Sequence, residues 1–301
     1  MHPGITIRVL SHNRRDFLVQ TLDSAFAQTE PFDTVELYDN GSDFPVRDLA
    51  ALYPALHLFA LPRPVPVLDN VRRAFTAAPA NPWLCVFHDD DLLHPDFCRK
   101  TRAAILRHPG ISAVSCNGEV IDSGGARLGP LLPGLAEDRL LAGPAELARW
   151  YCESFIPFPV VVYRWDANFG ADKDFAKPYG RCGDVAFLSR IVQRAPILIR
   201  AARDFSYRRH GGQSSAGFLW WEESKRWQLQ LDLCQGDPAA RRYVQDRRNA
   251  RLTSRWLNAW LRDEPRTEPW DWAFFSLAAT HRFFRNQKLP VFRRIFRFGG
   301  T

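Results

Sequence analysis

Four adjacent polar residues, His88, Asp89, Asp90 and Asp91, directly follow the apolar run Trp83–Phe87. Three neighbouring carboxylates repel one another, so the cluster is costly unless a cation or solvent relieves the repulsion. Carboxylate oxygens are hard ligands that suit Mg²⁺ or Mn²⁺, and either ion can bridge to the oxygens of a diphosphate. The pattern therefore predicts a metal–diphosphate site, and a solvated acidic turn that caps the next helix is the alternative.

Three further polar residues lie where a predicted strand ends or a predicted helix begins. Asp39 precedes the turn Asn40-Gly41-Ser42, where its carboxylate is placed either to accept hydrogen bonds from a base or ribose or to stabilise the turn. Asn70 opens a helical run and either reaches a donor base or caps the helix. Asp184 precedes the helical run Val185–Gln193 as either a general base or a helix cap.

His210 lies in the basic, glycine-containing segment Arg208–Ser214. An imidazole in such a loop can ligate a metal or contact a phosphate. The same composition is equally typical of a solvated surface loop.

The elements that must position these residues alternate between strand and helix over the first 121 residues. Predicted strands cover Ile5–Leu10, Thr34–Tyr38, Leu56–Ala60, Trp83–Phe87 and Ile111–Ile121, and predicted helices cover Asp16–Ala27, Asp69–Ala78 and Pro95–Arg107. This alternation favours a mainly parallel α/β sheet, which binds ligands at the carboxyl ends of its strands. Asp39 and the acidic cluster are therefore expected at one edge.

The pattern changes after residue 121. We expect a loop over Asp122–Gly143, helices over Pro144–Glu153 and Gly183–Gln193, an apolar segment at Val160–Tyr163, a strand at Ile197–Arg200 and a Trp-rich helical region from Phe218.

The composition is that of a globular protein, with 301 residues of which 46% are hydrophobic and 24% charged. We expect a cytoplasmic protein, because there is neither a signal-peptide pattern nor a long apolar run, and the six cysteines form no CxxC pair.

The net charge of +7 is concentrated in a tail that lacks acidic residues from Trp272 onwards. Segment 281–298 interleaves arginines with phenylalanines, which predicts peripheral contact with the inner face of an anionic membrane or, alternatively, a helix packed on the domain. No nucleic-acid-binding motif is present, so no nucleic-acid partner is expected.

The ordered set of segments resembles the family 2 glycosyltransferases of the GT-A fold. Ile5–Thr29 is similar to the family's opening, a strand ending in Ser-x-Asn and a helix of the type L-x-x-x-L-x-S-x-x-x-Q, here Ser11, Asn13, Leu18, Leu22, Ser24 and Gln28. ELYDNGSD resembles the strand that ends in DDGSxD, and FHDDDLLHPD resembles the DxD region. GRCGDVAFLSRI resembles the segment of the catalytic base, and YRRHGGQSS resembles a late loop that closes over the diphosphate.

The resemblance implies a fold and a domain organisation. The fold would be α/β of the GT-A type, with a single Rossmann-like, mainly parallel sheet flanked by helices. The catalytic domain would span residues 1–215, divided into a nucleotide-sugar half over about 1–121 and an acceptor half over about 122–215. A helical, Trp-rich and basic C-terminal extension would span 216–301.

The resemblance also implies roles for individual residues. The donor nucleotide would be bound by Leu10, His12, Asn13, Asp39, Asn70 and Asp89, with Asp39 at the nucleobase and Asp89 at the ribose. Asp90 would be the leading ligand of Mn²⁺ or Mg²⁺. Asp91 is a second candidate ligand, because three acids in a row leave the register ambiguous, and His210 is a third. Asp184 would deprotonate the acceptor hydroxyl in an inverting displacement.

Two departures from the family pattern leave the donor base and sugar open. His88 occupies the place of the first acidic residue of the motif, and Tyr38-Asp39 replaces a pair of acids. There is also no Q-x-x-R-W motif, because Glu223 precedes Arg226-Trp227 where a glutamine would stand, which favours addition of one sugar over polymerisation.

The expected partners are a nucleotide-sugar donor, with UDP- or dTDP-sugars favoured, and a glycan or lipid-linked acceptor of bacterial surface polysaccharide or glycolipid synthesis. Three rival interpretations have less support. A sugar nucleotidyltransferase would need glycine in the basic segment Ser11–Arg15, and a phosphohydrolase with an HD pair would hold that pair among helices. A catalytically degenerate binding module of the same fold would not need all the acidic positions.

Overall fold

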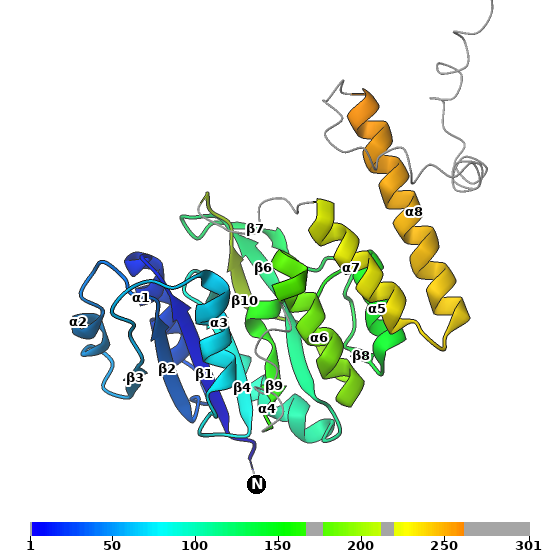
Figure 1. Cartoon of the computed structure of the whole chain (residues 1–301). Helices are drawn as coiled ribbons and strands as arrows, with labels where there is room; N and C mark the ends of the chain where they lie inside the picture. Colours follow the sequence, from blue (N-terminus) through cyan, green and yellow to red (C-terminus); the bar gives the residue numbers. More distant parts are fainter. Residues whose placement is uncertain (1, 167–176, 212–219, 262–301) are drawn as a thin grey trace, which may run out of the picture.

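The structure is a computed structural model that describes residues 2–166, 177–211 and 220–261. Its centre is a 10-stranded mixed sheet with the strand order β3-β2-β1-β4-β9-β6-β10-β5, where β7 also pairs with β6 and β8 with β10 (Figure 1).

Six strands of this sheet run in one direction. They are β1 (Ile5–Ser11), β2 (Thr34–Asp39), β3 (Leu56–Leu58), β4 (Trp83–His88), β6 (Ala113–Ile121) and β10 (Ile197–Arg208). The short strands β5 (Leu92–Leu93), β7 (Arg127–Pro130), β8 (Arg139–Leu141) and β9 (Val162–Arg164) run in the opposite direction. The sheet is therefore parallel in its long central strands and antiparallel mainly through short additions.

Strand β1 shows how the sequence builds both faces of the sheet. Its side chains alternate between faces, as in any strand. Ile5 and Ile7 lie in one apolar cluster with α4, and Leu10 lies in another with α3 and α5. Because every residue of β1 is buried, the strand is central and covered on both sides.

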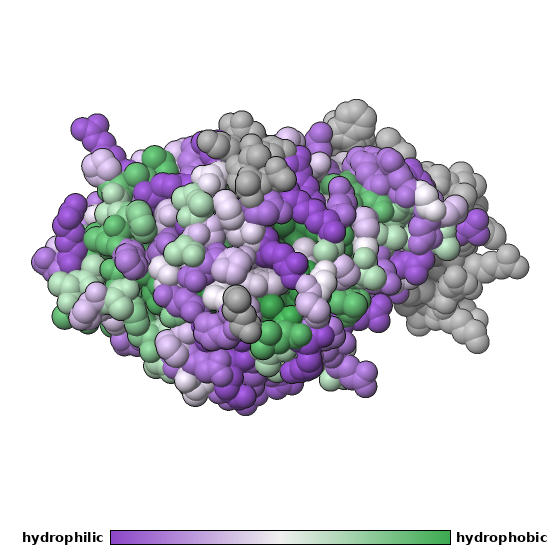
Figure 2. Space-filling view, turned by 90° about the horizontal axis from the view of Figure 1, so that it is seen from below, coloured by the Kyte–Doolittle hydropathy of each residue, from purple (hydrophilic) through white to green (hydrophobic). Residues whose placement is uncertain are grey.

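Helices cover both faces of the sheet (Figure 1). The clusters of buried side chains place α1 (Arg15–Phe26), α2 (Val46–Ala50) and α4 (Phe97–Arg107) on one face. They place α3 (Val67–Thr76), α5 (Pro144–Glu153), α6 (Gly183–Arg194) and α7 (Trp220–Leu233) on the other. Figure 2 views the molecule from below, and hydrophilic residues cover much of that face between separate apolar groups.

A buried ion pair ties α3 to the centre of the sheet. Arg8 Nε donates to Glu36 Oε2 at 2.6 Å, and Arg8 Nη1 donates to the backbone oxygens of Ala74 and Ala77 at 2.6 and 2.7 Å. These carbonyls lie at the C-terminal end of α3, where the helix dipole favours a cation. Arg8 therefore fixes the end of α3 on β1 and β2.

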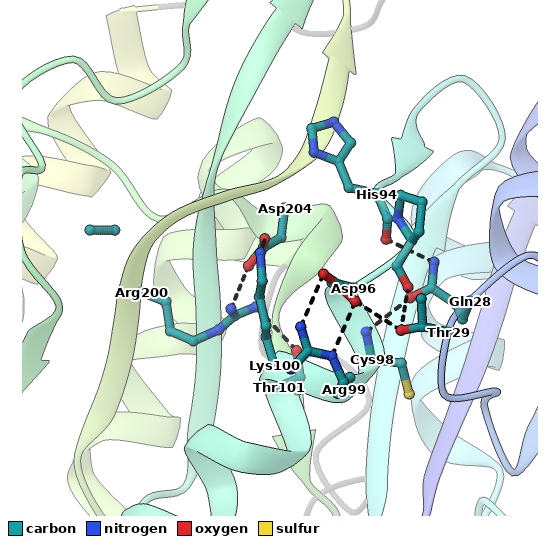
Figure 3. A network of polar contacts seen from close by, with 12 residues as sticks. Gln28, Thr29, His94, Asp96, Cys98, Arg99, Lys100, Thr101, Arg200 and Asp204 are labelled. Carbon is teal, nitrogen blue, oxygen red and sulfur yellow. Dashed lines mark hydrogen bonds and ion pairs between the residues drawn. The ribbon is translucent and has the colours of Figure 1, made fainter.

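A second polar network fixes β10 where its pairing with β6 shifts register (Figure 3). The buried Asp204 accepts from Lys100 Nζ at 2.6 Å and from Arg200, whose guanidinium also donates to Thr101 Oγ1 at 3.2 Å. His94 and Ser206 form a further hydrogen bond of 3.0 Å between their side chains. The network joins α4 to β10 and sets the course of the strand toward Arg208.

The helices after residue 219 share the main core. Trp227 and Leu231 of α7, and Val244 of α8 (Pro238–Leu261), belong to the same apolar cluster as α5 and α6. Gln230 also donates to the backbone oxygen of Ala148 at 3.0 Å. In the described part of the chain, no helix has the length and apolarity needed to cross a bilayer. The predicted membrane contact through 281–298 lies outside the described residues.

Most of the predicted elements form, with small changes at their ends. Asp122–Gly143 is not purely a loop, because it contributes β7 and β8 to the edges of β6 and β10. Helix α3 begins at Val67 after Pro66, so Asn70 lies inside the helix and does not open it. Strand β10 continues to Arg208, eight residues beyond the predicted end. All six cysteines are free thiols.

Candidate active site

The acidic cluster and Asp39 meet at the carboxyl edge of the parallel strands. In the β1–β2 register Ser11 pairs with Asp39, and in the β1–β4 register Leu10 pairs with His88. Three adjacent strands therefore end side by side, and the polar residues that follow them share one edge. This is the edge at which open α/β sheets bind ligands.

Among the residues that the structure describes, His88, Asp90 and Asp91 form a group that could hold a metal ion. Each offers one ligand atom, and these atoms lie within 4.8 Å of one another. Asp91 is fully buried, and its Oδ2 has no hydrogen-bond partner among the described residues. An unpaired carboxylate oxygen inside a protein is costly unless a cation or proton compensates it. The oxygen and imidazole ligands present fit Mn²⁺ or Mg²⁺.

Two basic side chains and one backbone amide already contact this cluster from the edge of the sheet. Arg14 Nη1 donates to both Asp89 Oδ1 and Asp90 Oδ2 at 3.0 Å. The His12 amide donates to Asp89 Oδ2 at 3.0 Å, and His210 Nε2 lies 2.9 Å from Asp90 Oδ2. The structure thus brings His210 to the acidic cluster, although it lies 120 residues away in the sequence.

Arg208 contacts the acidic cluster through its backbone and its side chain. Its backbone amide donates to Asp91 Oδ1 at 2.8 Å, and its Nε donates to the Asp90 backbone oxygen at 2.9 Å. The guanidinium lies 4.6 Å from the centre of the Phe17 ring and is fully buried. Thr21 Oγ1 donates to the Asp91 backbone oxygen at 2.8 Å, so α1 and β10 together orient the loop.

Burial shifts the pKa values of three residues in the cluster. Burial raises the pKa of Asp91 well above its usual value, and the neighbouring Asp90 raises it further, against the opposing effect of Arg208. Burial likewise raises the pKa of Asp89, and it lowers the pKa of His88. The site is therefore short of positive charge, and a divalent cation would favour the ionised carboxylates.

A cavity of about 490 Å³ opens beside Asp39. Its walls come from the end of β2, the loop after it, the start of α2 and the loop after β3, and they consist of residues 39, 42, 44–48 and 60–62. Asp39 is buried, and its carboxylate accepts from the Ser42 amide at 3.0 Å and from Ser42 Oγ at 2.5 Å. The turn interpretation of Asp39 is thus observed, and the same contacts hold its carboxylate in place at the cavity wall.

The other predicted donor-binding residues differ in their surroundings. Leu10 packs in the apolar core, whereas His12 and Asn13 are exposed. The Asn13 side chain exchanges hydrogen bonds with Asp43, through Nδ2 to Oδ2 at 2.9 Å and from the Asp43 amide to Oδ1 at 2.7 Å. Asn70 is buried and accepts from Arg73 Nη2 at 2.9 Å. Their contacts with a donor stay predictions.

Asp184 lies in the first turn of α6, one residue after Gly183 begins the helix. It is partly exposed, and its Oδ1 accepts from the Val185 amide at 2.8 Å. Burial raises the pKa of Asp184 to about 6, although this hydrogen bond and the charge of Arg226 act in the opposite direction. A carboxylate with that pKa is suited to accept a proton near neutral pH.

The segment before Asp184 is held by a residue of α7. Glu222 is buried and accepts from the Arg181 backbone amide at 2.8 Å and from Arg181 Nη2 at 2.8 Å. Gly180 has a φ of 55°, and a Cβ there would collide with Glu222 and Trp221. We call this contact between Arg181 and Glu222 the α7 latch. Nearby, Glu223 forms ion pairs with Arg251 and Arg226. Glu223 is the residue that stands where the Q-x-x-R-W motif would have its glutamine, and these ion pairs give it a structural role.

If the α7 latch positions Asp184, Glu222→Gln is expected to lower kcat by up to about 10²-fold, because small misplacements of reacting groups have effects of that size. The KM for the donor should change little, and the melting temperature should fall by a few degrees. Steady-state kinetics and thermal denaturation measure both. Asp232→Asn, on an exposed position of α7, is the matched control; a loss of stability with an unchanged kcat would show that the latch is structural only.

The sequence gives no role to three residues that the structure brings to the cluster, His88, Arg14 and Arg208. His88 opens the acidic cluster and departs from the family motif, and its place beside the carboxylates is the signal that it can serve as a ligand. Arg14 follows Asn13 in the first motif, and Arg208 lies at the start of the last one. Their partners are distant in the chain, so no spacing rule indicated them.

The architecture and the position of the acidic cluster define a GT-A fold. The chain is similar to crystal structures of residues 1–349 of S. aureus TarS, at 13% identity in each case. With UDP-GlcNAc bound, the TM-score is 0.60 over 93% of this chain and 80% of that chain. Without a named ligand it is 0.58, over 81% of this chain and 69% of that chain. With UDP it is 0.57, over the same shares of the two chains.

The family model "Glycosyl transferase family 2" matches residues 6–148, from β1 into α5. Residues 6–148 therefore match the family 2 glycosyltransferases, and the resemblance seen in the sequence and the predicted GT-A fold are confirmed. No curated protein matches the sequence significantly.

Proposed function

We propose that this glycosyltransferase moves a sugar from a nucleoside-diphosphate donor to an acceptor hydroxyl, with inversion at the anomeric carbon. The observation that carries the proposal is the unpaired, buried Oδ2 of Asp91 within the group His88, Asp90 and Asp91. The cavity at Asp39 lies at the end of β2 and this group follows β4, and both strands pair with β1. A cation site and a cavity at the same carboxyl edge suit a ligand with a nucleoside at one end and a diphosphate at the other.

The donor is proposed to be a UDP- or dTDP-sugar. Asp39 would accept a hydrogen bond from the base, and Leu10, His12, Asn13 and Asn70 would line the nucleoside site. Asp89 would approach the ribose. Similar structures of TarS hold UDP-GlcNAc and UDP, which supports a uridine nucleotide as the first donor to test.

Asp90 and Asp91 would hold Mn²⁺ or Mg²⁺, with His88 and His210 as the nitrogen ligands available beside them. A divalent ion bound there supplies Lewis-acid stabilisation of the negative charge that develops on the leaving diphosphate. Arg208 would keep the two carboxylates in place, because it holds Asp91 Oδ1 and the Asp90 backbone.

Asp184 would act as the general base. It would take the proton of the acceptor hydroxyl as that oxygen forms its bond to the anomeric carbon. The bond from this carbon to the phosphate oxygen breaks on the opposite face, and its electron pair leaves with the nucleoside diphosphate. One displacement of this kind inverts the anomeric centre.

The acceptor is proposed to be a glycan or a lipid-linked sugar of bacterial surface polysaccharide or glycolipid synthesis. A cytoplasmic enzyme in peripheral contact with the membrane through 281–298 would meet such an acceptor. The lack of a Q-x-x-R-W motif favours addition of a single sugar.

The anomeric configuration of the product tests the proposed reaction. We expect that a UDP- or dTDP-α-sugar gives a β-linked product, because Asp184 can activate only the attacking hydroxyl. Proton NMR of the anomeric signal during turnover distinguishes the two outcomes. Omission of the acceptor controls for donor hydrolysis, and a product that retains the donor configuration would exclude the role proposed for Asp184.

A further inference from the structure

Arg14 occupies the two carboxylates that the proposed donor and metal both require. A single nitrogen, Nη1, lies 3.0 Å from Asp89 Oδ1 and 3.0 Å from Asp90 Oδ2. Asp89 Oδ2 already accepts from the His12 amide, and Asp90 Oδ2 also contacts His210. A ribose hydroxyl at Asp89 and a metal at Asp90 would therefore both compete with the same guanidinium.

The backbone around Arg14 is fixed, so the side chain is the part able to move. Asn13 has a φ of 55° and is held by its two hydrogen bonds to Asp43, and its amide donates to Ser42 Oγ at 3.0 Å. Leu18 continues α1 directly after this turn, with its amide bonded to the Arg14 backbone oxygen at 2.9 Å. The Arg14 side chain is 32% exposed, so it can leave the carboxylates toward solvent.

Arg208 makes an instructive contrast. It is 1% exposed, and it contacts the cluster through its backbone amide, which donates to Asp91 Oδ1, and through its Nε, which donates to the Asp90 backbone oxygen. If the Arg208 side chain left this position, its buried guanidinium would lose hydrogen-bond partners, which costs free energy. Arg208 is therefore buried beside the cluster, whereas the Arg14 side chain reaches solvent.

We propose that Arg14 is an exchangeable counter-cation that neutralises Asp89 and Asp90 in the unliganded enzyme and is displaced when metal and nucleotide bind together. The proposal rests on the metal and donor sites of the proposed function and adds a regulatory consequence to them. When the metal or the nucleotide displaces Arg14, the other ligand no longer has to compete with the guanidinium. The affinities for metal and nucleotide are therefore coupled, and the coupling is reciprocal. Metal alone should then bind weakly, and the enzyme should load metal with its donor.

The test measures Mn²⁺ binding to the full chain by the EPR signal of free Mn²⁺, first without nucleotide. Arg14→Ala is expected to lower the Kd for Mn²⁺ by about 10-fold relative to wild type, because the competing hydrogen bonds to charged groups are worth about that factor. Arg15→Ala is the matched control. This neighbouring side chain is 59% exposed and does not contact the cluster in the described structure, so the Kd should stay within about twofold of wild type.

A second titration adds saturating UDP, or dTDP if UDP does not bind. Wild type should gain more Mn²⁺ affinity from the nucleotide than Arg14→Ala does, because only wild type still holds the competing guanidinium. Arg14→Gln repeats both titrations if the alanine variant melts at a lower temperature than wild type in EDTA.

Two results would overturn the proposal. If Arg14→Ala and Arg14→Gln bind Mn²⁺ no more tightly than Arg15→Ala, while wild type still binds Mn²⁺ with nucleotide, Arg14 does not compete and only the exchange is wrong. If no protein binds Mn²⁺ even with UDP or dTDP, the metal site of the proposed function fails, and the exchange fails with it.

Discussion

Replacement of Asp184 by asparagine is expected to lower kcat by about 10²–10⁴-fold, the range typical for loss of a general base. The amide has the size of the carboxylate and can still accept from the Val185 amide, so α6 should begin as before. It cannot take a proton from the acceptor. Initial rates of nucleoside diphosphate release measure the effect, and titration with nucleotide and Mn²⁺ should give wild-type affinities.

Asp166→Asn is the control for this substitution, because Asp166 is an exposed acid whose described ion pair is with Arg194. It should leave kcat unchanged. If Asp184→Asn kept kcat within about threefold of wild type, a value far outside the effect of a lost general base, Asp184 would not be the base.

The pKa of Asp184 adds a dependence on pH to this prediction. Burial raises this pKa to about 6, and only the ionised carboxylate is a base. The rate should therefore rise with pH through about 6 and level off above it, and Asp184→Asn should lack this limb. Because the folded pKa exceeds the unfolded value of 3.8, the contribution of Asp184 to stability is complete below pH 3.8 and is lost as the pH rises through about 6. At pH 8 the asparagine variant should thus melt above wild type.

Asp90→Ala is expected to have the second large effect, a loss of about 10³-fold in the rate of transfer. The size follows from the several kcal/mol that Lewis-acid stabilisation contributes, at about 1.4 kcal/mol for each factor of ten. The substitution removes the carboxylate that contacts Arg14 and His210 and leaves His88 and Asp91 without their partner ligand. Rates measured over a Mn²⁺ titration should show that added metal does not restore activity.

Asp16→Ala controls for the removal of one negative charge, since the Asp16 side chain is 91% exposed in the first turn of α1. It should behave as wild type. An Asp90→Ala enzyme whose activity remained dependent on Mn²⁺ at the wild-type level would move the metal away from the acidic cluster.

The long strands could be predicted from the sequence because each is a local pattern. Strand β1 alternates apolar with polar residues over Ile5–Val9, the run Trp83–Phe87 is continuously apolar, and helix Pro144–Glu153 is predicted at its observed limits. Strands β5, β7 and β8 span two to four residues, which is too short for any periodicity to show. They exist because they pair with long neighbours. Strand β10 was predicted too short because its central residues, around Arg203, follow a register shift and lack alternation.

The residues of the site likewise fall into those that local motifs predict and those that depend on the fold. Asp39, Asp89 to Asp91 and His210 could be chosen because ordered motifs carry them, and the structure brings the cluster and His210 together. Their supporting contacts could not be predicted. Arg208 reaches Asp91 across 117 residues, and Arg14 reaches Asp89 across 75, so these pairs depend on the sheet order and not on local spacing. The contact of Glu222 with the segment before Asp184 could not be predicted either, because Glu222 lies on α7, outside the motifs.

Isothermal titration of the full chain with UDP, dTDP and GDP, each with Mn²⁺ and with EDTA, is the most direct test of the proposed donor and metal sites. We expect one nucleotide to bind in the presence of Mn²⁺, to bind much more weakly in EDTA, and to lose its dependence on metal in Asp90→Ala. This result would join the nucleotide and the metal at the acidic cluster. Failure of all three nucleotides to bind a folded protein with Mn²⁺ present would contradict the proposed donor site, and the fold would then serve a purpose other than transfer from a nucleotide sugar.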